Sequence, residues 1–197
     1  VLIILSVFLL TSCSGIVPES DLVDQSVVSN NEPLSLSDNK ANQGSIYLDV
    51  PYQKYQGKNW CLPASGAMTF EYLGLEISQQ ELAQEIIKPN GLGNIPKLVK
   101  LAQNYGFQAK FTALTLKQIE DYLAQEIPLI AIQEYKASNP LAHARVIVGF
   151  DSDKKEIITN DPTIGQGYTV SYDMFNNLNL TTNPEYCMAI VITPKLI

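Results

Sequence analysis

The chain has little of several residue types on which common functions depend. It carries one histidine and three cysteines in 197 residues, and its net charge of −7 includes no cluster of basic residues. Nucleic-acid binding needs a Lys/Arg footprint against the phosphates, so we expect no nucleic-acid partner. The cysteines, at positions 13, 61 and 187, have neither the spacing of a disulfide framework nor a CxxC metal motif. We therefore expect no metal or other cofactor, and each cysteine has to be interpreted separately.

Long apolar runs are also missing. The first ten residues are apolar or nearly so and carry no charge, which is too short for a bilayer span but typical of a signal-peptide core. Because no Met or basic residue precedes them, we expect the sequence to begin inside this leader. The run ends in Leu10-Thr11-Ser12-Cys13, which resembles a bacterial lipobox. Residues 1–13 are therefore predicted to be a signal peptide with Cys13 as the lipidated residue; the alternative is a plain secretory leader with a chance cysteine.

Residues 14–45 are rich in Ser, Asn, Asp and Pro and show no sustained apolar period. Such a composition cannot bury enough apolar surface to fold, so this segment is predicted to be a disordered tether. As a coil it would separate the anchor from the rest of the chain by roughly 30 Å. We expect residues 46–197 to form the functional domain, held outside the cytoplasm on a bacterial membrane by the lipid at Cys13.

The pattern within the domain changes along the chain. Helices are predicted first, from apolar residues at helical spacing and from capping residues, at residues 63–75, 78–87, 94–106 and 115–125. Short β-branched runs between turns then predict strands at 128–135, 144–151, 155–161, 167–172 and 186–193. Residues 45–53 are predicted to be a strand or an extended entry segment, and residues 173–178 a short helix. This order predicts an α+β fold in which an N-terminal helical half packs on a C-terminal antiparallel sheet half.

Four kinds of side chain in this domain can perform acyl-transfer chemistry together. Cys61 stands near a predicted helix start, and His143 stands where a strongly apolar strand begins. A helix N-terminus and a nearby imidazolium both favour a thiolate nucleophile, and histidine exchanges protons near neutral pH. A carboxylate or amide from Asn160-Asp161 can orient the imidazole, and an amide N–H from Gln53 or Gln56 can meet a developing oxyanion.

The stretches VPYQKYQ, WCLPAS, HARVIVGFD and NDP occur in this order over most of residues 46–197. Together they resemble papain-like cysteine peptidases, and more closely the cysteine peptidase family numbered thirty-nine. That family includes bacteriocin-leader peptidases and stand-alone relatives, which commonly read VPYxxQ…CGPAS…H…VxxGYD…DP. The resemblance implies a papain-like fold and a peptide or protein substrate.

The resemblance also implies roles for individual residues. Cys61 would be the nucleophile, His143 the general base and acid, Asp161 the orienting residue with Asn160 as the alternative, and a glutamine the oxyanion donor. The family's glutamine lies about six residues before its cysteine, so Gln56 is preferred over Gln53. The family's usual glycine after the cysteine is Leu62 here, and we expect this side chain to narrow the cleft or crowd the thiol.

The sequence leaves other functions open. A different thiol acyl-transfer enzyme, either transglutaminase-like or a cell-wall amidase, would use the same chain order of Cys, His and acid. A catalytically inactive peptide-binding module on the same fold is a further alternative, kept open by Leu62. Cys187 lies inside an apolar strand and is predicted to be an ordinary core residue. The expected function is that of an extracytoplasmic, membrane-anchored cysteine peptidase.

Overall fold

The computed structural model describes residues 44–137 and 139–195, so the predicted leader, the Cys13 lipidation site and nearly all of the predicted tether lie outside the described residues. The described chain contains five helices and seven strands. In chain order the elements are β1 (Ser45–Tyr47), α1 (Cys61–Tyr72), α2 (Gln79–Ile86), α3 (Ile95–Asn104), β2 (Gln108–Leu114), α4 (Leu116–Leu123), β3 (Leu129–Lys136), β4 (Asn139–Asp151), β5 (Glu156–Asp161), β6 (Gly165–Ser171), α5 (Tyr172–Asn177) and β7 (Cys187–Thr193).

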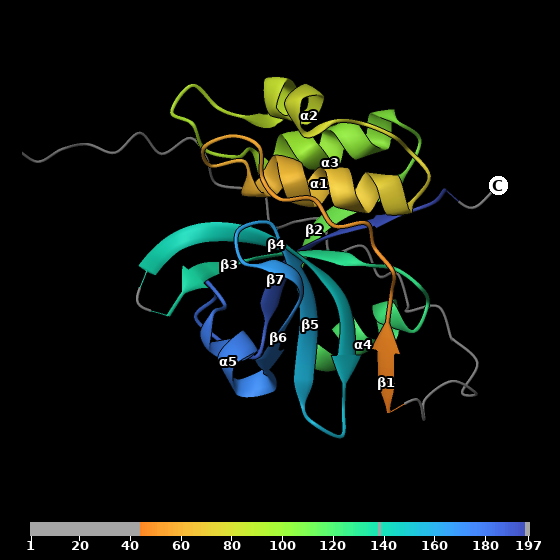
Figure 1. Ribbon diagram of the computed structural model, residues 1–197, viewed down its shortest axis with the longest axis vertical. Coiled ribbons are helices and arrows are strands. Elements are labelled where there is room, and N and C mark those ends of the chain that lie inside the picture. The colour runs from red at the N-terminus through yellow and green to blue at the C-terminus, as the bar shows by residue number, and fades with distance from the viewer. Residues whose placement is uncertain (1–43, 138, 196–197) are drawn as a thin grey trace, which may run out of the picture. The chain divides into compact units, whose positions relative to one another are not determined.

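All strands belong to one antiparallel sheet. The strand order is β2-β7-β3-β4-β5-β6, and β1 pairs with the C-terminal end of β4. β4 is the longest strand and contacts β3, β5 and β1, so it joins the two sides of the sheet (Figure 1). Its pairing with β5 contains a bulge between Ile147 and Gly149, which adds local twist at that point.

The sheet is covered by helices on both faces. Figure 1 shows α1, α2 and α3 together on one side, and α4 and α5 on the other. The sequence of β3 explains how one strand serves both layers, because successive side chains of a strand point to opposite faces. Ile130 and Ile132 join the core under the three helices, whereas Leu129 and Ala131 join the core that includes α4 and α5.

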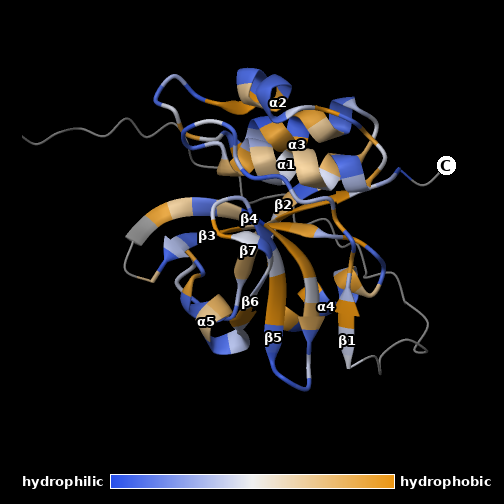
Figure 2. Cartoon of the chain, viewed as in Figure 1, coloured by the Kyte–Doolittle hydropathy of each residue, from blue (hydrophilic) through white to orange (hydrophobic). Residues whose placement is uncertain are grey.

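The colouring of Figure 2 follows from this arrangement. The middle strands are apolar along most of their length because both of their faces are buried, while the turns and outer helix surfaces are polar. α1 is buried over nearly its whole length, between the sheet and the α2–α3 pair. Within the described part of the chain, no helix combines the length and apolar character needed to cross a bilayer.

The α+β prediction is confirmed, but two details are wrong: a strand was not expected between α3 and α4, and α1 begins earlier than expected. Residues 108–114 form the strand β2 between α3 and α4, so the helices do not all precede the sheet. β2 is an edge strand paired only with β7, and only Leu114 in it is buried, which leaves it without the apolar alternation of an inner strand. Residues 45–47 of the expected entry segment form β1, and α1 begins at Cys61 instead of residue 63.

Candidate active site

Cys61 is the first residue of α1, and the turn before it fixes the helix start. The Trp60 N–H donates to the Gly57 carbonyl at 3.1 Å, and Asn59 takes a left-handed conformation with φ of 63°. The Trp60 ring lies so close to Gly57 that a Cβ there would stand 2.4 Å from the ring. Trp60 makes no side-chain cap, so the first N–H groups of α1 are left for other acceptors. Pro63 has no N–H and that of Ala64 donates to the Trp60 carbonyl at 2.9 Å, so the N–H groups of Cys61 and Leu62 are those left at the helix start.

His143 lies on β4, opposite Gln133 of β3, and is only 6 % exposed. Its Nε2 lies 3.0 Å from each carboxylate oxygen of Asp161, and the imidazole also interacts with the Cys61 thiol, which raises the pKa of His143. The Tyr135 ring packs edge-on against the imidazole at 5.2 Å between centroids. The imidazole is thus held between a thiol and a carboxylate.

Asp161 ends β5 and is fully buried. Besides contacting His143, its Oδ1 accepts the N–H groups of Thr163 at 2.8 Å and Ile164 at 3.2 Å, which is the ordinary way that an aspartate organises the turn after it. The structure thus brings Cys61, His143 and Asp161 together from α1, β4 and β5. Asn160 does not contact His143: its amide donates to the Val50 carbonyl and accepts the Gly167 N–H.

The three groups change one another's proton affinity. Burial alone would raise the pKa of the Cys61 thiol, but the hydrogen bond and charge of His143, aided by the N–H groups of Ala144 and Leu62, outweigh it and lower the pKa. Burial would lower the pKa of His143, yet its bonds to Asp161 and Cys61 raise it. The lowered pKa of the thiol and the raised pKa of the imidazole both favour transfer of the thiol proton to the imidazole.

The two glutamines have different surroundings. The Gln53 amide donates to Glu71 Oε2 at 2.7 Å and accepts from Gln79. Because Glu71 is ten residues beyond Cys61 on α1, about 15 Å along the helix axis, the Gln53 amide is engaged away from the thiol. Gln56 is exposed, and its backbone N–H donates to Gln79 at 3.0 Å. None of the hydrogen bonds among the described residues joins its side-chain amide to Cys61 or His143.

Leu62 does not do what the sequence led us to expect. Its side chain is 4 % exposed and belongs to the core under α1, α2 and α3. It packs on Gly93, where an added Cβ would stand 2.8 Å from a Leu62 methyl carbon. Leu62 thus fills interior space beside the loop before α3, and the expectation that it crowds the cleft is wrong.

Two residues at the site were missed from the sequence. Arg145 is 1 % exposed and its Nε lies 3.4 Å from Asp161 Oδ2. Gln79, 1 % exposed at the start of α2, bonds to Gln53, to the Lys54 carbonyl and to the Gln56 N–H, and so holds the segment before α1 at three points. A signal existed for Arg145, since it is the single arginine of the chain and stands two residues after the single histidine. No local pattern singles out Gln79.

The segment that carries the glutamines is tied to the turn that carries the acid. The Tyr52 hydroxyl donates to the Asp161 carbonyl at 3.3 Å, and the Tyr55 N–H donates to the Pro162 carbonyl at 3.2 Å. Residues 52–56 therefore lie next to the site although their glutamine side chains do not reach the thiol. Across residues 44–137 and 139–195, no group of three or more His, Cys, Asp or Glu side chains is arranged to hold a metal ion.

A helix-borne cysteine facing a strand-borne histidine and acid, with helices layered on an antiparallel sheet, defines the papain-like class of fold. The sequence model of the Peptidase_C39 like family matches residues 47–181, which include Cys61, His143 and Asp161. The chain therefore belongs to the Peptidase_C39 like family. No curated protein matches it by sequence.

Solved structures place the fold in the same class. A C39-like peptidase candidate from Bacillus anthracis superposes with a TM-score of 0.62 at 17% identity, over 79% of this chain and 100% of that one. A double-glycine-motif protease of an AMS/PCAT transporter, solved in complex with its leader peptide, gives 0.59 at 21% identity over 76% and 94%. Xylellain, a cysteine protease from Xylella fastidiosa, gives 0.58 at 12% identity over 78% and 87%. The papain-like fold predicted from the sequence is confirmed.

Proposed function

We propose that this chain is a cysteine peptidase that hydrolyses peptide bonds with Cys61 as nucleophile, His143 as general base and acid, and Asp161 as the residue that orients the imidazole. The observation that carries the proposal is the continuous hydrogen-bonded series from the Cys61 thiol through His143 to Asp161. Membership of a peptidase family supports it.

The chemistry follows from the position of each group. The Cys61 thiolate attacks the carbonyl carbon of the scissile bond, and the negative charge moves to the carbonyl oxygen. The Cys61 backbone N–H at the start of α1 can stabilise that oxyanion, with the Gln56 amide joining once substrate draws it toward the thiol. The His143 imidazolium then gives its proton to the departing amine, the C–N bond breaks, and a thioester to Cys61 remains.

Water completes the reaction. His143, now neutral, takes a proton from a water molecule whose oxygen attacks the thioester carbonyl. The carboxylic product leaves, and the Cys61 thiolate and His143 imidazolium are restored. Throughout, the Asp161 carboxylate keeps the imidazole in one orientation because its Oδ1 is fixed by two backbone N–H groups.

We propose a peptide or protein segment as substrate, acted on outside the cytoplasm. The transporter protease that shares the fold was solved with a leader peptide, which supports a peptide ligand at this site. The lipobox-like Leu10-Thr11-Ser12-Cys13 supports attachment to a bacterial membrane through a lipid at Cys13. Incorporation of a labelled fatty acid by the full chain and its loss in Cys13→Ser would support the anchor; equal labelling of both would contradict it.

A substrate survey tests the activity. The full chain is incubated with a peptide library and, separately, with purified cell-wall fragments, and new termini are identified by mass spectrometry. We expect cleaved peptide bonds that disappear with Cys61→Ala and His143→Ala. Cleavage confined to wall fragments would replace the proposal by an amidase, amide exchange without hydrolysis by a transglutaminase-like enzyme, and binding without any product by an inactive peptide-binding module.

A further inference from the structure

Arg145 has an unusual place in this chain. The sequence contains twelve lysines and one arginine, and that arginine is among the largest fully buried side chains. It lies on β4 two residues after His143, so both side chains leave the strand on the same face. A buried guanidinium is costly unless its charge is compensated, which makes its neighbours informative.

The contacts of Arg145 all lead to groups around His143. Its Nε lies 3.4 Å from Asp161 Oδ2 and makes no hydrogen bond, so this is a contact between charges. Its Nη2 donates to the carbonyls of Glu134 and Tyr135 at 3.2 Å each. Tyr135 is the residue whose ring packs against the imidazole. One side chain thus touches the acid behind His143 and the backbone of the residue beside it.

We propose that Arg145 is a positioning residue of the active site, which keeps the Asp161 carboxylate ionised and directed at His143 and sets the pH range in which the Cys61–His143 pair carries its charges. This inference rests on the proposed function, since it concerns the same cysteine and histidine. It gives the site four alternating charges: thiolate, imidazolium, carboxylate and guanidinium.

The electrostatics agree with this arrangement. His143 and then Arg145 lower the pKa of Asp161 against the effect of burial. The other groups that face Arg145 are the Cys61 thiol, the Tyr168 phenol of β6 and the Cys187 thiol of β7, and burial raises the pKa of Cys187 to about 12. The positive charge of Arg145 therefore favours the Cys61 thiolate and opposes the His143 imidazolium. It also offsets part of the negative charge of Asp161, which stabilises that imidazolium.

A lysine at position 145 would not reproduce the charge and the contacts of the guanidinium. The planar guanidinium presents its nitrogens in a fixed fork and stays protonated when buried, whereas a buried ammonium loses its proton more easily. In Arg145 the fork directs Nε toward the carboxylate and Nη2 toward two carbonyls at once.

The test follows the alkylation of Cys61 by iodoacetamide in the full chain from about pH 4 to pH 10, with the label read at Cys61 by mass spectrometry. The wild-type profile should show two inflections, one where the thiolate–imidazolium pair forms and one where the imidazolium loses its proton. We expect Arg145→Met to move both inflections upward by about one pH unit. Arg145→Lys should restore them only in part, because a buried ammonium loses its proton more easily and cannot reproduce the guanidinium fork.

The matched control is Lys154→Met, which removes the same charge from an exposed ion pair with Asp151 at 2.8 Å and should leave both inflections in place. Should Arg145→Met fail to fold, the single variant D161N is compared with the double variant D161N/R145M. In the double variant both charges of the buried contact are removed, so no buried carboxylate is left without its cation. We expect both inflections to move upward in this pair as well, by a smaller amount because the carboxylate is absent. The proposal is overturned if loss of Arg145 leaves the inflections unchanged, either between wild type and R145M or between D161N and D161N/R145M.

This readout needs no substrate, so it separates two failures. If the wild-type chain cleaves no peptide but R145M shifts the inflections, the proposed peptidase activity fails and the role of Arg145 stands. If the chain cleaves peptides and R145M leaves the inflections unchanged, Arg145 only joins strands, and the peptidase proposal stands without it.

Discussion

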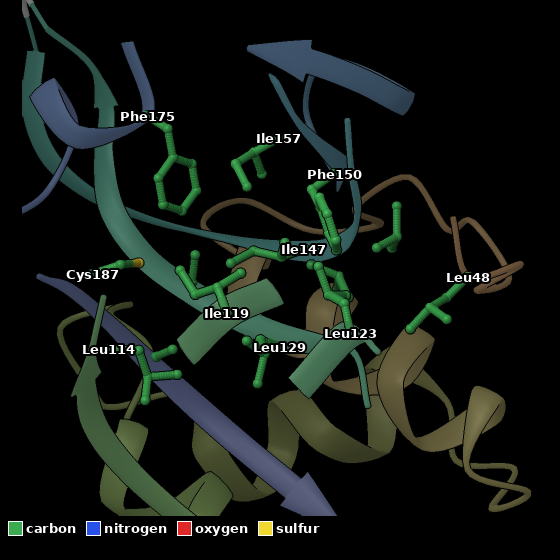
Figure 3. Close-up of a cluster of buried hydrophobic side chains, with 14 of the residues drawn as sticks. Leu48, Leu114, Ile119, Leu123, Leu129, Ile147, Phe150, Ile157, Phe175 and Cys187 are labelled. Atoms are coloured by element: carbon green, nitrogen blue, oxygen red, sulfur yellow. The ribbon is translucent and has the colours of Figure 1, made fainter. Parts of the chain in front are cut away.

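The two described cysteines show how strongly position decides the chemistry of one side chain. Cys187 begins β7 and lies among apolar side chains of α4, α5 and the sheet, with its sulfur directed into that cluster (Figure 3). There burial raises its pKa to about 12. Cys61 is partly buried, but its pKa is lowered because His143 and the N–H groups of Ala144 and Leu62 act on the sulfur.

Burial is therefore not what separates a structural cysteine from a reactive one. Burial disfavours the anion of both thiols, although Cys187 is buried and Cys61 only partly so. The difference is that Cys61 stands beside His143 and backbone N–H groups, all of which favour its anion. The Cys187 thiol instead donates to the Met188 carbonyl at 3.6 Å, and the charge of Arg145 only partly offsets its burial. Removing parts of the Cys61 environment should make it resemble Cys187.

The largest change is expected from His143→Ala. Without the imidazole, the Cys61 thiol keeps the cost of burial and loses its main stabilising partner, so its pKa rises. Peptide cleavage should fall by at least about 10³-fold. Alkylation of Cys61 at pH 7 should approach the slow rate of Cys187, measured in the same protein by mass spectrometry. Rapid alkylation of Cys61 in this variant would show that the helix start alone activates the thiol.

Leu62→Ala should come next in size and act on stability. The side chain is buried against Gly93 and the helices around it, so truncation leaves a cavity and costs about 2–4 kcal/mol of unfolding free energy. Denaturant unfolding measures this loss. Because the side chain is buried against Gly93 and carries no charge, the pH profile of Cys61 alkylation should remain that of the wild type. A changed profile would mean that Leu62 shapes the site after all.

Asp161→Asn should have a smaller effect, a downward shift in the pH at which the His143 imidazolium loses its proton. The amide preserves the shape of the carboxylate but removes the charge that raises the pKa of His143, so the imidazolium is lost at lower pH. The upper inflection of Cys61 alkylation should therefore move down by about one pH unit. This is opposite to the direction expected for R145M. An upper inflection that stays in place would contradict the contribution of Asp161 charge to the imidazolium.

Cys187→Ala should be the mildest variant. It removes one sulfur from a packed core and should cost about 1 kcal/mol of stability, measured by thermal or denaturant unfolding. Neither peptide cleavage nor the alkylation profile of Cys61 should change. In the wild-type protein Cys187 should become labelled only when denaturant opens the core. Rapid labelling of native Cys187 would contradict its burial.

Much of the fold could be read from residue patterns because they reflect local physics. The capping box of Ser78 and Glu81 and the N-cap Asn94 mark real helix starts. The start of α1 was placed two residues late, because Trp60 is a poor N-cap and the helix begins through a turn stabilised by ring packing on Gly57. β2 was missed because an edge strand needs little apolar alternation.

The site was predictable where scarce residue types limit the choice. One histidine leaves one candidate base, and the structure brings it to Cys61 and Asp161. The choices between Asp161 and Asn160, and between Gln56 and Gln53, depended on side-chain directions that follow from tertiary packing. The same holds for Gln79, whose contacts span 23 to 26 positions in sequence and leave no local trace.

The contact between Leu62 and Gly93 has a consequence for comparing relatives of this protein. The space between the start of α1 and the loop before α3 holds one side chain, and here residue 62 supplies it while residue 93 supplies none. A relative with glycine after its cysteine has that space free for a larger residue on the loop. Substitutions at positions 62 and 93 should therefore be correlated across the family. The residue after the cysteine does not by itself show whether a relative has a competent active site, because its effect depends on the residue at the position of Gly93.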